Sequence, residues 1–234
     1  MKVAVFGLEN FDIGKYSLDD ERLDGLEAVF KPKKTTTIQI DFVAMDEIKD
    51  AEVVLTSEEK RADLIITDLD YVSERLAKEI PDQEKALFTR MKETLEKEEL
   101  LFPTLTEDER KTLKGYPLIS RLPVCLAKGP ADSVELDDDI LKEIYYASGR
   151  IGFFTGGPKD VRMWSVRKGT TAYEAAGCIH SDIQAGFIRA EVCSVDDILS
   201  AGHYNQVKNE GKVRLEEKDY IVQDGDYIIF LSNK

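Results

Sequence analysis

Short apolar runs mark the strands expected in the first half of the chain. Residues 2–6 (KVAVF), 37–45 (TIQIDFVAM) and 122–127 (LPVCLA) each read as a buried strand. Between the first two, apolar residues recur near helical spacing over 18–30, with Ser17 or Asp19 as the candidate N-cap and Pro32 beyond the end. This strand–helix–strand order predicts a parallel sheet with a crossover helix.

The middle of the chain has a different, helical pattern. Residues 57–80 and 83–101 are long, charged, free of glycine and interrupted only at Pro81-Asp82, which predicts an antiparallel helical hairpin. The DLIIT stretch alone would also suit a strand, and only its helical flanks favour a helix. A third helix is expected from Thr106, where Glu109 completes a capping box, and a fourth over ELDDDILKEIYYASG.

From about residue 151 the pattern changes to short strands separated by turns. VRMWSV, FIRAEVCS and the two runs that flank Asp224-Gly225 read as strands, and TTAYEAAGCI reads as a helix. The pattern predicts a small α+β domain over 151–234 after an α/β domain over 1–150.

Charge is distributed unevenly along the 234 residues, whose formal net charge is −14. Residues 1–150 hold 34 acidic and 22 basic residues, whereas 151–234 hold 12 and 10. A chain this acidic is repelled by polyphosphate, so no DNA binding is expected and any RNA contact needs a local basic patch. The candidate RNA- or partner-binding residues are Lys159, Arg162, Arg167, Lys168 and Arg189; the alternative is that they are ordinary solvated surface charges.

Other candidate chemistry is sparse. The three cysteines form no CxxC pair and are expected to be reduced and structural, and neither His180 nor His203 stands at a metal-ligand spacing. We therefore expect no metal site. Trp164 sits in an alternating strand and is expected to be a core anchor. The absence of a signal-peptide pattern or a long apolar window predicts a cytoplasmic protein without membrane contact.

The blocks FFTGGPKDVRMWSVRKGT, AAGCIHSDIQAGFIRAE and KDYIVQDGDYIIF resemble the C-terminal TGS domain of the Obg-like ATPase (YchF) family. Further blocks at 20–36, 62–76 and 105–124 are also similar to that family and occur in its order. The resemblance implies a truncated P-loop-like α/β domain with a helical hairpin insertion at about 57–101, followed by a β-grasp (ubiquitin-like) TGS domain.

Active members of that family carry a phosphate-binding GxxxxGK[ST] loop after the first strand, whose backbone N–H groups surround the phosphates. Here the glycines are two residues too far apart, and Tyr16 replaces the Mg²⁺-binding hydroxyl, with Ser17 one place late. Glu9 and Asp12 add negative charge where phosphate would lie. The candidate nucleotide-binding residues are Gly7, Asn10, Gly14, Lys15 and Ser17; the alternative is a turn that serves packing only.

Two other family elements are missing from this sequence. The nearest candidate for the Asp-x-x-Gly sensor, residues 41–44, lacks its glycine, and Lys128-Gly129-Pro130 stands where a base-reading asparagine is expected. Gln184 and neighbouring residues also depart from the TGS pattern before GFIRAE. Without the phosphate cradle and the metal ligand, most of the stabilisation that phosphoryl transfer needs would be missing.

These observations predict a non-catalytic interaction protein that presents its TGS domain to RNA, the ribosome or a protein partner, with no catalytic residues and no cofactor. The alternative is a protein that binds ATP or GTP with Mg²⁺, or an NTPase, through a remodelled loop. A third hypothesis is a subunit that regulates an intact relative through the acidic hairpin. A homodimer is also open, because a shortened sheet can expose an edge.

Overall fold

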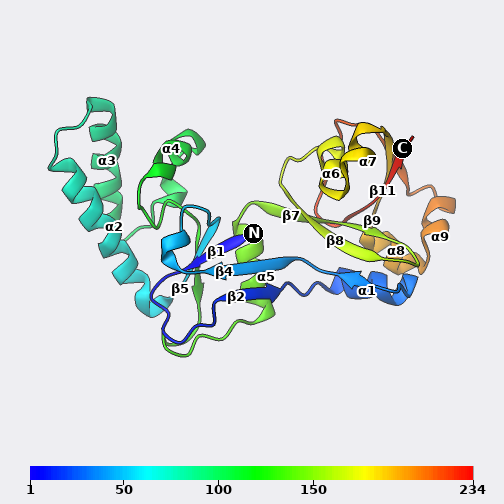
Figure 1. Cartoon of the computed structure of the whole chain (residues 1–234), viewed down its shortest axis with the longest axis horizontal. Helices are drawn as coiled ribbons and strands as arrows, with labels where there is room; N and C mark the ends of the chain where they lie inside the picture. The colour runs from blue at the N-terminus through cyan, green and yellow to red at the C-terminus, as the bar shows by residue number, and fades with distance from the viewer. Residues whose placement is uncertain (234) are drawn as a thin grey trace. The chain divides into compact units, whose positions relative to one another are not determined.

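The computed structural model describes residues 1–233 and divides into two compact units (Figure 1). The first unit comprises Met1–Tyr16 and Gln39–Ser148, and the second comprises Ser17–Ile38 and the chain from Gly149. The division at residue 150 expected from the sequence therefore missed residues 17–38, which pack with the C-terminal part of the chain. None of the helices in residues 1–233 is long and apolar enough to cross a bilayer.

A five-stranded sheet forms the centre of the first unit, in the order β2-β4-β1-β5-β6. The neighbours β4, β1, β5 and β6 are parallel. The strands are β1 (Lys2–Val5), β2 (Gly14–Ser17), β4 (Gln39–Val43), β5 (Val53–Ser57) and β6 (Val124–Ala127). Strand β5 is absent from the sequence prediction; its five residues are all buried, and a central parallel strand has no alternating pattern.

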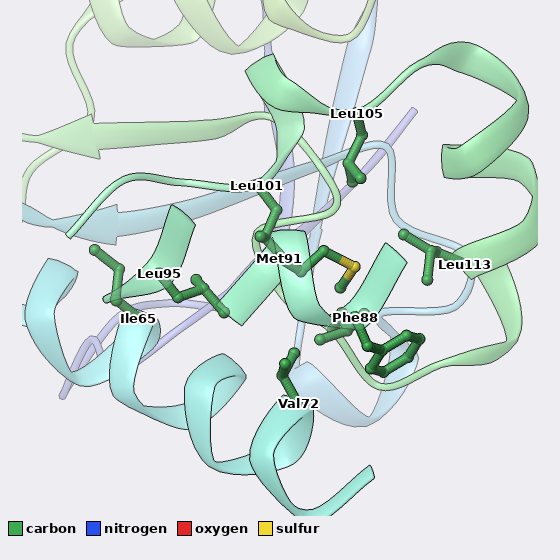
Figure 2. Close-up of a cluster of buried hydrophobic side chains, with 9 residues drawn as sticks. Ile65, Val72, Phe88, Met91, Leu95, Leu101, Leu105 and Leu113 are labelled. Carbon is green, nitrogen blue, oxygen red and sulfur yellow. The ribbon is translucent and has the colours of Figure 1, made fainter. Parts of the chain in front are cut away.

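The expected hairpin helices are α2 (Arg61–Leu76) and α3 (Asp82–Leu95), and DLIIT is helical. One face of each helix packs into a cluster that also takes in the chain that follows (Figure 2). Figure 2 labels Ile65, Val72, Phe88, Met91, Leu95, Leu101, Leu105 and Leu113 of that cluster. The capping box of α4 (Glu107–Thr112) is confirmed, and α5 (Asp138–Ala147) closes the unit. Single 3₁₀ turns occupy Met45–Glu47, Glu58–Lys60, Phe102–Thr104 and Leu113–Gly115.

The helix predicted over 18–30 exists as α1 (Glu21–Phe30), but its predicted role as a crossover helix is wrong. It packs against elements of the second unit, where it is the blue helix among yellow and orange elements in Figure 1. Gly25 permits the close approach, because a Cβ there would lie 2.7 Å from the Leu199 side chain. Arg22 forms ion pairs with Asp20 and Asp224, and Asp20, rather than Ser17 or Asp19, is the N-cap.

A six-stranded mixed sheet forms the second unit, in the order β10-β9-β11-β7-β8-β3. Its hairpin of β7 (Arg150–Gly156) and β8 (Val161–Arg167) is antiparallel, and β11 (Asp226–Ser232) is parallel to β7. The remaining elements are β3 (Thr35–Thr36), α6 (Ala172–Ile179), α7 (Ser181–Ala185), β9 (Phe187–Ser194), α8 (Val195–Ala201), α9 (Tyr204–Asn209) and β10 (Arg214–Glu216). The strand predicted before Asp224 is absent, and there only Ile221 forms an isolated bridge.

Candidate functional site

The carboxyl ends of four parallel strands meet at one edge of the first unit, which is where open α/β sheets bind ligands. Gly7 follows β1 at this edge in the left-handed region, with φ of 65°. A Cβ at Gly7 would lie 3.2 Å from Lys60 Cγ, so the stem of Lys60 already covers the backbone of the glycine. Lys60, rather than Lys15, is thus the lysine that packs on Gly7.

Hydrogen bonds join the loops at this edge to one another. Thr56 Oγ1 donates to the Phe6 carbonyl at 2.9 Å, and Glu9 N–H donates to the Ala131 carbonyl at 2.9 Å. Ala131 N–H in turn donates to Glu59 Oε2 at 3.0 Å. The edge thus carries the carboxylate of Glu59 and a lysine, Lys60, paired with Asp63 at 3.2 Å. Neither Glu59 nor Lys60 was predicted from the sequence, because β5, which positions both, has no alternating pattern.

The structure does not bring Lys15 to Gly7. In a phosphate-binding loop the lysine opens a helix, whereas Gly14–Ser17 here form strand β2. The exposed Lys15 lines an open recess of about 500 Å³ formed at the amino ends of β1, β4 and β5, the edge opposite Gly7. The other residues of this recess are Met1, Lys2, Gln39, Asp41, Asp50 and Glu52.

The other predicted nucleotide-binding residues are also dispersed. Asn10 is exposed in the turn after β1 with φ of 58°, and the exposed Ser17 belongs to the second unit. Tyr16 has a packing role, because its ring lies 5.2 Å from Phe42 and 6.3 Å from Phe11. Tyr16 stands where the phosphate-loop pattern has a Mg²⁺-binding hydroxyl. Here it belongs instead to an aromatic cluster that packs β2 on the sheet.

The five predicted basic residues of the second unit do not form one cluster. Lys159 precedes β8, Arg162 lies within it, and Arg167 and Lys168 lie at its far end. Arg189 lies on β9, separated from β8 by β11 and β7, and pairs with Glu217 at 3.2 Å. Arg189 therefore does not contribute to a common patch with the residues of β8.

Arg162 is held against an aromatic stack. Its guanidinium carbon lies 3.8 Å from the centre of the Trp164 ring, and that ring stacks on Phe153 with an interplanar angle of 14°. Trp164 Nε1–H donates to Thr155 Oγ1 at 2.9 Å, which fixes the orientation of the indole. Trp164 is half-buried against the core of this unit, so it packs as expected and also carries Arg162.

Both histidines cap helices. His180 Nδ1 accepts from Asp182 N–H, and His203 Nδ1 accepts from Asn205 N–H, each at 3.1 Å. Within residues 1–233, no three His, Cys, Asp or Glu side chains gather closely enough to hold a metal ion. The three cysteines are free, and burial raises the pKa of both Cys125 and Cys193 to about 12.

The fold is therefore a parallel-sheet α/β unit together with a mixed-sheet unit that carries a stacked arginine. Residues 151–233 match the family model YchF-GTPase_C, described as "Protein of unknown function (DUF933)". The "Ribosome-binding ATPase YchF" of Bacillus subtilis is 48% identical over 96 residues, 41% of this chain and 26% of that protein. The "Obg-like ATPase 1" of Rattus norvegicus is 53% identical over 81 residues, 35% of this chain and 20% of that protein.

Among solved structures, the chain is similar to the Schizosaccharomyces pombe YchF GTPase, with a TM-score of 0.71 at 16% identity. The match covers 99% of this chain and 97% of that one, which shows a shared mixed α/β fold. The chain is thus related to the YchF and Obg-like ATPases. The matched region spans about a fifth to a quarter of the length of these curated relatives.

Proposed function

We propose that this chain is a ribosome-associated RNA-binding protein that acts through its second unit, a TGS domain of the β-grasp type. The proposal rests on the match to the family model over residues 151–233. A relative of this chain is named for ribosome binding. A ribosomal partner would place the protein in the cytoplasm.

The strand order supports the β-grasp assignment. The chain enters through the hairpin β7–β8, continues through α6 and returns along β9 and β10, and β11 then inserts between β9 and β7. The central pair β7–β11 is parallel and its outer neighbours are antiparallel. In this arrangement the helix α6 packs on the mixed sheet, against β8 and β9.

Sedimentation of the full chain with purified ribosomes tests this proposal. We expect the protein to pellet with ribosomes through a sucrose cushion at low salt and to be released at high salt, because phosphate contacts weaken as counterions compete. If the chain stays in the supernatant at every salt concentration, ribosome association is wrong. Pull-down of a protein, or a dimer by light scattering, would then favour a protein partner or a second copy.

Nucleotide binding is the second candidate function. The relatives are named ATPases and the solved neighbour a GTPase, which favours ATP or GTP with Mg²⁺ over a chain that needs no cofactor. The loop geometry disfavours phosphoryl transfer, because Gly14–Ser17 form a strand and the Glu59 carboxylate at the carboxyl edge would repel phosphate. A nucleotide would lie at the carboxyl edge near Gly7 and Lys60, not near Lys15.

Thermal shift with ATP or GTP plus Mg²⁺ tests this second function. Binding raises the melting temperature with ligand concentration, following RT ln(1 + [L]/Kd). We expect Lys60→Ala to abolish such a shift and Lys15→Ala, the matched control at the opposite edge, to leave it unchanged. The reverse result would restore the remodelled loop as the site, and no shift in wild type would exclude the second function.

A further inference from the structure

Strand β3 brings a distant basic segment to the start of β8. Thr35 and Thr36 pair in parallel with Val161 and Arg162, and Val161 N–H donates to the Lys34 carbonyl at 3.0 Å. The segment before β3 reads Lys31-Pro32-Lys33-Lys34. Three lysines from the acidic half of the sequence therefore lie beside the turn and strand that carry Lys159 and Arg162.

These side chains are uncommitted within the protein. Lys31, Lys33, Lys34 and Lys159 are exposed, and among residues 1–233 none of their side chains, nor that of Arg162, has a hydrogen bond or ion pair. Asp160 is the acidic residue of the same turn, and its carboxylate pairs with none of them in that part of the chain. The segment before β3 and the start of β8 therefore hold five cations and one acid, in a chain of net charge −14.

Arg162 gives this surface a planar element beside its point charges. Its guanidinium lies on Trp164, which lies on Phe153, so three planar groups are stacked in sequence from the core outward. The Nε of Arg162 is buried, which leaves the terminal nitrogens for a ligand. A stacked guanidinium is pre-organised to donate to phosphate and to stack under a base.

We propose that these residues form a single-stranded RNA subsite, called here the β3–β8 surface and defined as Lys31, Lys33, Lys34, Lys159, Arg162 and Trp164. The lysines contact successive phosphates, and one unpaired base stacks at the Arg162–Trp164 pair. Unpaired strands suit this surface because a base offers its open face only when it is unstacked from its neighbours. This inference rests on the proposed function and assigns the RNA contact to residues that the sequence pattern alone did not group.

Fluorescence anisotropy with a labelled single-stranded oligouridine and a duplex RNA of equal length tests the assignment. We expect the full chain to prefer the single strand. The double variant Lys33→Glu/Lys34→Glu should bind about tenfold more weakly or worse at low salt, and the slope of log K against log[salt] should shrink by about 0.7 for each phosphate that is no longer neutralised. The control Lys78→Glu/Lys85→Glu makes the same charge change on exposed lysines of the first unit and should bind like wild type.

Arg162→Lys separates stacking from charge. It keeps the cation and removes the planar group, so we expect oligouridine affinity to fall about threefold to tenfold with little change in the salt slope. An unchanged affinity in both Arg162→Lys and Lys33→Glu/Lys34→Glu, in folded protein that still pellets with ribosomes, would overturn the inference and leave the proposed function intact. If wild type pellets with ribosomes yet binds neither RNA, the RNA assignment is wrong.

Discussion

Asp68 shows how one buried residue determines local structure. Its carboxylate is fully buried in α2 and accepts from the backbone N–H groups of Ile119 and Ser120 at 2.7 and 2.8 Å, and from the Ser120 hydroxyl. These bonds attach the segment before β6 to the hairpin. Burial raises the pKa of Asp68, against the opposing effect of its hydrogen bonds.

Asp68→Ala should therefore strongly destabilise the first unit. The substitution leaves two buried backbone donors and a hydroxyl without their acceptor, which typically costs about 1–3 kcal/mol for each unsatisfied buried group. Urea unfolding followed by circular dichroism would measure the decrease in stability. The matched control Asp70→Ala changes an exposed acid of the same helix and should stay within about 0.5 kcal/mol of wild type.

Glu191 provides a pH-dependent prediction in the second unit. Lys208 Nζ and Tyr204 Oη each lie 2.6 Å from its carboxylate, and these bonds lower the pKa of Glu191. A lowered folded pKa contributes stability above the unfolded pKa of about 4.3, and that stability disappears as pH falls through the folded value. Glu191→Gln should cost about 0.5 kcal/mol at pH 7 and nothing once both states are protonated. A melting-temperature difference that is equal at pH 7 and pH 3 would contradict this.

At the scale of elements, α1 is the feature that most changes the fold from the one its sequence predicts. Its buried Leu23 and Leu26 face the rest of the second unit, where α1 contacts α8 and the β7–β8 hairpin. Leu26 has no exposed surface. Because α1 leads directly into the lysines of the β3–β8 surface, its packing also places that surface.

Leu26→Ala should lower the stability of the second unit by about 2–4 kcal/mol, because it leaves a cavity under α1. Trp164, the single tryptophan, reports on this unit by fluorescence. We expect its transition to move to lower denaturant, with Asp24→Ala as the exposed control in the same helix. An unchanged tryptophan transition would mean that α1 does not stabilise this unit.

Elements whose signal is local could be predicted from the sequence, whereas elements defined by distant partners could not. The capping box of Thr106 and Glu109 and the helical periodicity of 57–101 each lie within a few residues of the structure they specify. The apolar face of α1 could pack on any sheet, so the sequence of α1 alone does not specify its packing partner. The two-residue strand β3 has no pattern at all, yet it carries Lys31–Lys34 to β8.

The same limit applies to the candidate sites. The sequence pointed to Arg162 but grouped it with Arg189, because it could not show that two strands lie between β8 and β9. It likewise placed Lys15 with Gly7, since a loop pattern assumes a following helix, and here a strand carries Lys15 to the other edge of the sheet.

At the scale of the whole molecule, the two units offer different chemistry. In the first unit, hydrogen bonds of Glu9, Glu59 and Ala131 link the loops at the carboxyl ends of the parallel strands. The second unit presents a basic surface with a stacked arginine. The match to the family model, over residues 151–233, also falls on the second unit. We therefore assign ribosome contact to the second unit and reserve the carboxyl edge of the first for any nucleotide.

Hydrogen–deuterium exchange of the full chain with and without ribosomes tests this assignment most directly. We expect ribosomes to slow exchange in peptides covering 31–38 and 157–168, with no change in peptides covering 6–13, 57–60 and 128–133. Protection confined to those first-unit peptides, or no protection anywhere with ribosomes in excess, would contradict it.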